Sequence, residues 1–375
     1  MKYYLIAGEA SGDLHGSNLI NALKKEDAKA DFRVWGGDLM QNSGATLVKH
    51  YRDLAFMGFL EVVKNLRTIL GNIDFCKKDI LTFQPDVLIL IDYPGFNLRI
   101  AKWAKKQNIR VFYYISPQIW AWHTSRVHQI KQNIERMFVI LPFEKDFYKK
   151  YQYEVDFVGH PLLDAVKNFK SNPDFFEKNK IATDKKIIAL LPGSRKQEIS
   201  KLLPEMLSVV DYFSDYQFVI AGAPAMSEAF YKTFLQEKNI KIVFNETYNL
   251  LKNAHAALVT SGTATLETAL FSVPEVVCYK GSNVSYQIAK RLISIKYISL
   301  VNLIADKKIV TELIQNECNT HKIKEELFKI VEGNERAKML QNYADLHVLL
   351  GESGASEKTA KLMFGYLNAD KLKYE

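Results

Sequence analysis

The chain has 375 residues, of which 48% are hydrophobic and 25% are charged, and its formal net charge is +8. A chain of this length usually forms more than one hydrophobic core, so we expect two domains. The composition is that of a globular protein rather than a disordered or fibrous one. The three cysteines lie far apart without a C-x-x-C pair, which argues against a disulfide framework and a zinc knuckle. The positive charge suits nucleic acid, an anionic membrane or a phosphorylated substrate, and by itself chooses none of them.

No stretch of the sequence approaches the ~20 apolar residues of a membrane span. The first apolar run meets Glu9 too early for a secretory signal. We therefore expect a protein of the cytoplasm or of the cytoplasmic side of a membrane. The eight histidines include no H-x-H or H-E-x-x-H motif, so we expect no metal site.

Short apolar runs alternate with helical patterns, which is typical of parallel sheets covered by helices on both faces. The first half has strand candidates at 3–8, 32–36, 86–92, 110–116, 137–141 and 155–159. The second half has them at 186–193, 217–222, 240–244, 256–262 and 275–280. The pattern is helical after about residue 320, and a polar stretch follows Gly159–His160–Pro161. We predict an α/β protein with Rossmann-like domains at 1–165 and 166–345, and a helical segment at 346–375 that packs back or exchanges in a dimer.

The first strand runs into a glycine-rich loop in LIAGEASGDLHG, residues 5–16. Gly8, Gly12 and Gly16 are four residues apart, unlike the G-x-G-x-x-G of dinucleotide-binding folds. Such a loop commonly binds an anion at the N-terminus of the next helix, which we expect near Leu14. The alternative is that the glycines only permit a tight turn.

Residues 55–70 are more apolar than a surface helix with one buried stripe requires. Lys64 and Arg67 lie among the apolar residues, as in helices at a membrane interface. A helix packed between the sheet and a neighbouring element fits the same pattern. The basic stretch 287–297 leaves the same two interpretations open.

Asp92 ends a buried strand in LILIDYPGFN, residues 88–97. It thus lies at the carboxyl end of the strand, where ligands of such folds bind. It is a candidate general base, and a turn-forming aspartate before Tyr-Pro-Gly is the structural alternative. The next strand ends in SPQIWAW, residues 116–122, before a basic helix. Aromatic and basic residues together suit nucleic acid, a phosphorylated lipid or a tryptophan-rich core. Nothing resembles a nucleic-acid-binding module, so we expect no nucleic-acid partner.

A loop of the second half, LLPGSRKQE at 190–198, has the form of a phosphate site. Arg195 falls in the first turn of a helix, where a cation opposes the macrodipole unless an anion binds there too. A solvated arginine is the alternative. Ser194 and Gln197 fit a capping box, which would make Ser194 the N-cap of the helix.

A second loop of this form lies in VTSGTATLETAL, residues 259–270. The strand ends at Ser261–Gly262–Thr263, which offers backbone N–H groups and two hydroxyls to a diphosphate. Glu267, one turn into the helix, either accepts hydrogen bonds from ribose or only faces the helix N-terminus. Two phosphate-type loops in one Rossmann-like half, without a metal motif, suggest a sugar-nucleotide glycosyltransferase.

Several motifs occur together in one order along the chain. They are GEASGD at 8–13, FMGFLEV, IDYPGFN at 91–97, SPQIWAW at 116–122, LPFEKDFY at 141–148, VGHPL at 158–162, LLPGSR at 190–195, SGTATLE at 261–267 and SLVNLIA at 299–305. Together they resemble the lipid-A-disaccharide synthase family, the inverting glycosyltransferases of bacterial lipid A assembly. Many members read I-D-A-P-D-F-N where this chain has IDYPGFN, so Gly95 replaces a second acid and removes a rival base.

The resemblance implies a two-Rossmann, GT-B-type fold with its active site in a cleft between the domains. The implied reaction joins UDP-2,3-diacylglucosamine to lipid X, which is 2,3-diacylglucosamine 1-phosphate. Its products are a β-1,6-linked disaccharide 1-phosphate and UDP, formed without a cofactor or metal. The implied setting is the anionic cytoplasmic face of the inner membrane, with peripheral attachment and dimerisation through the C-terminal parts.

The resemblance also implies roles for individual residues. Asp92 and Arg195 take the places of the essential aspartate and arginine. The UDP side comprises Gly193, Ser194, Arg195, Ser261, Gly262, Thr263, Glu267, Asn302 and Gln315. The acceptor side, on our hypothesis, comprises Gly8, Glu9, Ser11, Gly12, Asp13, Ser116, Trp120 and Trp122. The residues expected to contact the membrane are Leu60, Val62, Val63, Leu66, Ile69 and Leu70.

Two alternatives compete with this interpretation. One is another UDP-sugar transferase or epimerase of the same fold, which would share the UDP loops but need not show GEASGD and SPQIWAW together. The other is a UDP-sugar-binding protein without catalysis, which would be indifferent to loss of Asp92.

Overall fold

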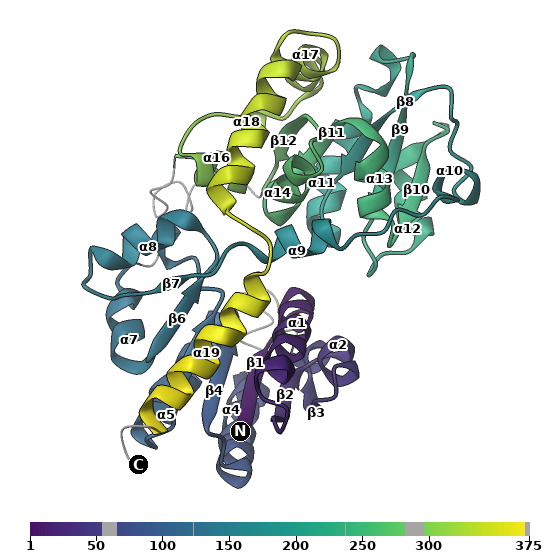
Figure 1. The fold of residues 1–375 in the computed structure, drawn as a ribbon. Coiled ribbons are helices and arrows are strands. Elements are labelled where there is room, and N and C mark those ends of the chain that lie inside the picture. The colour runs from purple at the N-terminus through teal and green to yellow at the C-terminus, as the bar shows by residue number, and fades with distance from the viewer. Residues whose placement is uncertain (55–65, 123, 237, 282–295, 372–375) are drawn as a thin grey trace. The chain divides into compact units, whose positions relative to one another are not determined.

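The computed structural model describes residues 1–54, 66–122, 124–236, 238–281 and 296–371 (Figure 1). The chain forms two units. Unit 1 comprises Met1–Pro161 and Glu352–Glu375, and unit 2 comprises Leu162–Gly351. Each unit is built on one parallel sheet, which confirms the predicted α/β class.

The sheet of unit 1 has the strand order β3-β2-β1-β4-β5-β6-β7. The strands are β1 (Lys2–Ala7), β2 (Asp31–Gly36), β3 (Thr46–His50), β4 (Val87–Ile91), β5 (Val111–Tyr114), β6 (Arg136–Val139) and β7 (Asp156–Phe157). The helices are α1 (Ala10–Glu26), α2 (Asp38–Asn42), η1 (Tyr51–Leu54), α4 (Leu66–Phe83), α5 (Pro94–Lys106), α6 (Ile119–Trp122), α7 (Arg126–Asn133), α8 (Pro142–Lys149) and α19 (Ala355–Lys371).

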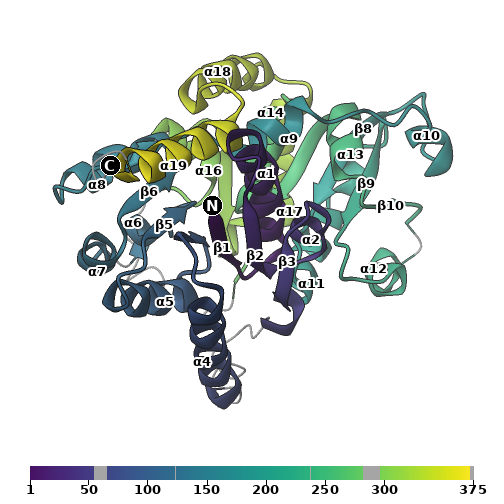
Figure 2. The ribbon, with the colours of Figure 1, turned by 60° about the horizontal axis from the view of Figure 1, so that its bottom comes forward.

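The central strands of unit 1 are buried on both faces, as their unbroken apolar runs predict. Tyr4 and Ile6 of β1 pack with residues of α4 and α5, whereas Tyr3 and Leu5 pack with residues of α1 and α19. In Figure 2, α19 lies beside α1. The last helix of the chain therefore completes the core of the unit that begins it.

The sheet of unit 2 has the strand order β10-β9-β8-β11-β12-β13. The strands are β8 (Lys186–Leu191), β9 (Tyr216–Gly222), β10 (Lys241–Phe244), β11 (Ala254–Thr260), β12 (Glu275–Tyr279) and β13 (Thr311–Ile314). The helices are α9 (Pro161–Lys167), α10 (Phe175–Lys178), α11 (Lys196–Leu207), η2 (Val210–Tyr212), α12 (Glu228–Leu235), α13 (Thr247–Asn253), α14 (Thr263–Leu270), α16 (Leu300–Ala305), η3 (Gln315–Glu317), α17 (Thr320–Val331) and α18 (Glu335–Leu350).

Strand order reverses once in each sheet, and each reversal point locates the candidate loops of its own unit. In unit 1 the chain runs outward from β1 to β2 and β3, then returns to place β4 on the other side of β1. In unit 2 the same reversal places β11 beside β8. Ligands of open parallel sheets bind beyond the carboxyl ends of the strands at such a point. The loops after β1, β4, β8 and β11 are the loops that the sequence analysis selected.

Two strands, β3 and β13, lie outside the predicted set. Both are edge strands of four or five residues, and their side chains are mostly only partly buried. An edge strand needs no solid apolar run, so the signal that identified the central strands is weak in both. Within the described residues, no helix combines the length and apolarity that crossing a membrane requires.

Candidate active site

Asp92 directly follows β4 and has an unusual backbone. Its φ is 43° and that of Tyr93 is 49°, so two consecutive non-glycine residues are left-handed. Such conformations cost free energy and persist only where the surrounding structure holds the backbone in them. The Asn97 side-chain amide donates to the Asp92 carbonyl oxygen at 2.8 Å, and the Tyr113 hydroxyl donates to the same oxygen. Since Asn97 and Tyr113 are fully buried, they clamp the candidate base in place.

The electrostatic surroundings of Asp92 suit proton transfer near neutral pH. Burial, and after it the negative charge of Glu9, together raise the pKa of its carboxyl to about 6. A base with such a pKa is mostly ionised at pH 7 and still accepts a proton readily. Glu9 is exposed and comes from the loop after β1, the strand next to β4. Two residues that the sequence predicts for the site, Glu9 and Asp92, therefore lie close enough to interact electrostatically.

The GEASGD segment is mostly helical rather than a loop. Helix α1 begins at Ala10, not near Leu14 as predicted, which places Ser11, Gly12 and Asp13 in its first turn. Gly8 has no room for a side chain, because an added Cβ would lie 2.3 Å from Cγ of Tyr93. Ser11 is exposed at the start of the helix.

Asp13 makes its contacts inside unit 1. Its carboxylate accepts the backbone N–H groups of Gly37, Met40 and Leu39 at 2.8, 3.0 and 3.1 Å. The side chain is buried and caps the N-terminus of α2. These contacts give Asp13 a structural role.

Ser116 and Trp120 lie in a buried cluster with two residues that the sequence analysis left without a role. The hydroxyls of Ser116 and Tyr148 are 2.7 Å apart, and the ring of Trp120 packs edge-on against Phe143 at 4.9 Å. Glu144 is buried beside them, where it accepts the Leu141 N–H at 3.0 Å and burial raises its pKa to about 7. The LPFEKDFY motif carried the signal for Glu144 and Tyr148. The side chain of Trp122 lies outside the described residues.

In unit 2, the loop after β8 does not form the predicted capping box. Helix α11 begins at Lys196 with Arg195 as its N-cap, and no side chain caps it. The Ser194 N–H instead donates to Glu198 at 3.2 Å, so the interpretation of Ser194 as N-cap is wrong. Arg195 is exposed and has no ion-pair partner among the described residues. Its charge is therefore available to a ligand.

The loop after β11 presents the N-terminus of α14, with Gly262 as N-cap at a φ of +117°. Nothing lies within 4 Å of an added Cβ at Gly262, so its backbone is open to an approaching group. Glu267 follows one turn later and accepts a hydrogen bond from the Tyr248 hydroxyl at 2.8 Å. Burial raises the pKa of the Glu267 carboxyl.

Asn302 and Gln315 differ in how their amides are used. Asn302 is fully buried; its Oδ1 accepts from Ile309 and Val310 N–H groups, and its Nδ2 donates to the Val310 carbonyl and Glu312. The Nε2 of Gln315 is buried at a left-handed residue after β13 and has no hydrogen-bond partner among the described residues. Gln315 therefore keeps a donor for a ligand, whereas Asn302 uses its amide within unit 2.

Three predicted membrane residues, Leu60, Val62 and Val63, lie outside the described residues, as does the side chain of Leu66. Ile69 is half-buried against the core of unit 1, and Leu70 is 49% exposed. The described part of the chain contains no cluster of three or more His, Cys, Asp or Glu side chains that could hold a metal ion.

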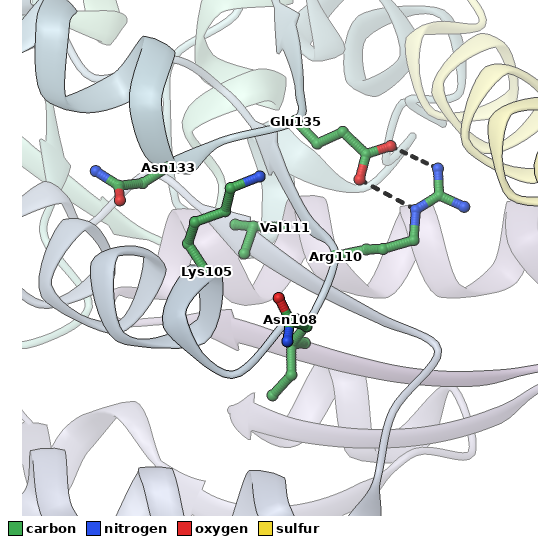
Figure 3. Close-up of a pocket in the computed structure, with 7 residues that line it drawn as sticks. Lys105, Asn108, Arg110, Val111, Asn133 and Glu135 are labelled. Atoms are coloured by element: carbon green, nitrogen blue, oxygen red, sulfur yellow. Dashed lines mark hydrogen bonds and ion pairs between the residues drawn. The ribbon is translucent and has the colours of Figure 1, made fainter.

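A separate hollow of about 160 Å³ lies at the opposite, amino end of the unit 1 sheet (Figure 3). Arg110 and Glu135 in its wall form two hydrogen bonds, Nε–Oε2 at 3.1 Å and Nη2–Oε1 at 2.5 Å. None of the predicted site residues lines it. The candidate site residues of each unit therefore lie in the loops after its own strands, not in this hollow.

Comparison with known proteins identifies relatives over nearly the whole chain. The family model described as Lipid-A-disaccharide synthetase matches residues 3–364. The lipid-A-disaccharide synthase of Syntrophus aciditrophicus is 41% identical over 364 residues, covering 95% of each chain. That of Trichlorobacter lovleyi is 37% identical over 366 residues, covering 96% of each chain.

Solved structures with low identity share the fold. A Neisseria meningitidis UDP-GlcNAc 2-epimerase bound to UDP-GlcNAc has a TM-score of 0.66 at 14% identity, covering 97% of this chain and all of its own. The glycotransferase of kitacinnamycin has a TM-score of 0.67 at 13% identity, covering 96% of this chain and 98% of its own. These similarities confirm the predicted two-domain glycosyltransferase fold with a helical C-terminus.

Proposed function

The chain belongs to the lipid-A-disaccharide synthase family, and from this premise we propose its substrates and the residues that act on them. As a member it is a glycosyltransferase that uses a UDP-sugar, and the epimerase and binding-protein alternatives are not favoured. The proposed donor is UDP-2,3-diacylglucosamine and the proposed acceptor is lipid X. The products are the β-1,6-linked disaccharide 1-phosphate and UDP.

The clamped, half-buried Asp92 carries the proposal. Its carboxylate takes the proton from the 6-hydroxyl of lipid X while the hydroxyl oxygen attacks the anomeric carbon of the donor. The bond from that carbon to the UDP oxygen breaks, the configuration inverts, and the leaving group departs as UDP. Glu9 assists by keeping the pKa of Asp92 close to the working pH.

Unit 2 supplies the charge stabilisation in this proposal. Negative charge develops on the diphosphate as it leaves, and Arg195 with the backbone N–H groups of 193–195 and 261–263 meets it. Glu267 and Gln315 hold the nucleoside, Glu267 through ribose hydroxyls. These groups take the place of a divalent cation, so we propose a metal-independent reaction.

The acceptor side and the membrane are also part of the proposal. Glu9 and Ser11 at the exposed start of α1, with the SPQIWAW segment, bind the acceptor sugar or its phosphate. Both substrates carry two acyl chains, so the enzyme works at the cytoplasmic face of the inner membrane. Leu70 and the segment before it provide reversible attachment. A homodimer forms through the C-terminal parts, and light scattering in detergent tests it.

A turnover assay in detergent micelles tests the proposed reaction. UDP-2,3-diacylglucosamine and lipid X are supplied with and without EDTA, to wild type and Asp92→Ala. We expect disaccharide and UDP from wild type, no effect of EDTA, and no product from the variant. Donor binding without disaccharide would contradict the proposed reaction, and full activity of Asp92→Ala would contradict the assigned base.

A further inference from the structure

Glu198, in the first turn of α11, connects the two loops assigned to the diphosphate. One carboxylate oxygen, Oε2, accepts the backbone N–H of Ser194 at 3.2 Å. The other, Oε1, accepts the hydroxyl of Thr260 at 3.0 Å. Ser194 belongs to the loop after β8, and Thr260 is the last residue of β11, directly before Ser261. One side chain therefore joins the ends of the two strands that flank the reversal point of unit 2.

The backbone around Glu198 is shaped to admit this carboxylate. Gly193 has a φ of +113°, and an added Cβ there would lie 2.1 Å from Oε2 of Glu198. Any other residue at 193 would be strained and would displace the carboxylate. Thr260 is buried, so its hydrogen bond to Glu198 is shielded from water on one side. The contacts of Glu198 thus depend on a glycine already assigned to the UDP side.

A carboxylate beside a diphosphate site has an electrostatic disadvantage. It repels the ligand, and it accepts the Ser194 N–H that a phosphate oxygen could otherwise accept. Such a group favours binding only if the order that it imposes on the loops outweighs the repulsion. Two hydrogen bonds to separate loops are the arrangement that imposes this order, because fixed N–H groups need no reorganisation when charge develops.

We propose that Glu198 is a positioning residue for the diphosphate: by bridging Ser194 and Thr260 it holds loops 193–195 and 261–263 in register for UDP. The inference rests on the proposed function, which assigns those loops to the nucleotide. Glu198 itself does not touch the reacting atoms. It acts through the backbone N–H groups of the two loops that it keeps in place.

Glu198→Gln and Glu198→Ala separate the bridge from its charge. Glutamine can accept the Ser194 N–H with its carbonyl oxygen and donate its amide to the Thr260 hydroxyl, so it keeps the bridge and removes the charge. Alanine removes both. Thr260→Val removes one arm of the bridge, and Thr260→Ser keeps the hydroxyl. Glu228→Ala on α12, whose carboxylate pairs with Lys232 on the surface, is the matched control.

The measurements are UDP affinity by calorimetry, steady-state kinetics with both substrates, and urea unfolding of every variant. We expect Glu198→Ala to weaken UDP binding about tenfold, the size of one lost charge-assisted hydrogen bond. Thr260→Val should weaken it in the same direction, and Glu198→Gln and Thr260→Ser should stay within about threefold of wild type. The KM for lipid X should not change. If Glu198→Ala does not fold, the Thr260 pair gives the same comparison.

Two results would overturn the inference. Tighter UDP binding by both Glu198 variants would show that the carboxylate competes with the nucleotide. Equal UDP affinity and kinetics in Glu198→Ala and wild type would show that the bridge orders nothing that UDP uses. Failure of the proposed function looks different: wild type would bind UDP without forming disaccharide while the ranking of the variants in UDP affinity stayed measurable. Wild type that does not bind UDP would overturn both.

Discussion

Replacing Asp92 by asparagine should abolish activity and stabilise the protein, because the carboxylate is costly where it lies. Its pKa rises from 3.8 to about 6 on folding, chiefly through burial. The folded state thus binds the proton more tightly, and stability is lost as pH rises from 3.8 through 6. Asparagine has no charge to bury, and it tolerates the left-handed backbone of this position.

The size of the effect follows from the two pKa values. Above pH 6 the full difference of about 2 pKa units applies, which corresponds to about 3 kcal/mol at pH 7.5. At pH 4.5 the folded carboxyl is largely protonated, and about 1 kcal/mol remains. Asp92→Asn should therefore gain more free energy of unfolding at pH 7.5 than at pH 4.5, by about 2 kcal/mol.

Urea unfolding followed by circular dichroism at both pH values measures this difference. Asp174→Asn, at an exposed position before α10, is the control for loss of an aspartate charge. An equal gain at both pH values, or a less stable variant at pH 7.5, would refute the argument that burial of the charge is costly. Activity is measured in parallel, because wild-type turnover in the variant would show that Asp92 is not the general base.

Three further predictions concern Arg195, the two side chains that hold the Asp92 backbone, and the structural role of Asp13. Arg195→Ala should lower kcat by roughly 10²–10³, as loss of a preorganised charge-stabilising donor does, and near-normal turnover would place the leaving group elsewhere. Asn97→Ala and Tyr113→Phe each remove one donor to the Asp92 carbonyl; each should lower kcat about tenfold with KM for the donor unchanged, and a change in KM alone would contradict the clamp. Asp13→Ala leaves three N–H groups of the 37–40 turn without their acceptor, so unfolding in urea should show a loss of about 1–3 kcal/mol, whereas lost acceptor binding at full stability would argue for a direct substrate role.

Much of this arrangement could be predicted from the sequence because its signals are local. Unbroken apolar runs such as VLILI of β4 identified the central strands, and glycines after β1, β8 and β11 marked the loops. Other features depend on residues distant in the chain. Asp13 caps a helix 24 residues away, and Glu198 meets Thr260 across 62 residues. The capping-box motif considers only the N-cap residue and the residue three positions later. It therefore could not predict that Glu198, four positions after Ser194, would accept the Ser194 N–H.

The left-handed backbone of Asp92 also lay beyond the sequence pattern. Tyr-Pro-Gly after an aspartate indicates a turn, but it does not say which residue carries the strain. The strain becomes identifiable only when Tyr113, one strand over, and Asn97, one turn on, are seen to share one carbonyl. Function was recognised from residue identities, whereas the means of holding those residues required the tertiary structure.

The placement of α19 affects the order in which a ribosome can deliver a foldable chain. Unit 2 is one continuous stretch, so all of its strands have left the ribosome while the last helix is still being translated. The sheet of unit 1 emerges first, yet α1 lacks its neighbour α19, whose Ala360, Met363 and Leu367 belong to the same core cluster, until the end of synthesis. For most of synthesis the nascent protein therefore exposes an apolar helix surface, and a stop codon before residue 355 would leave that surface permanently open to chaperones and proteases.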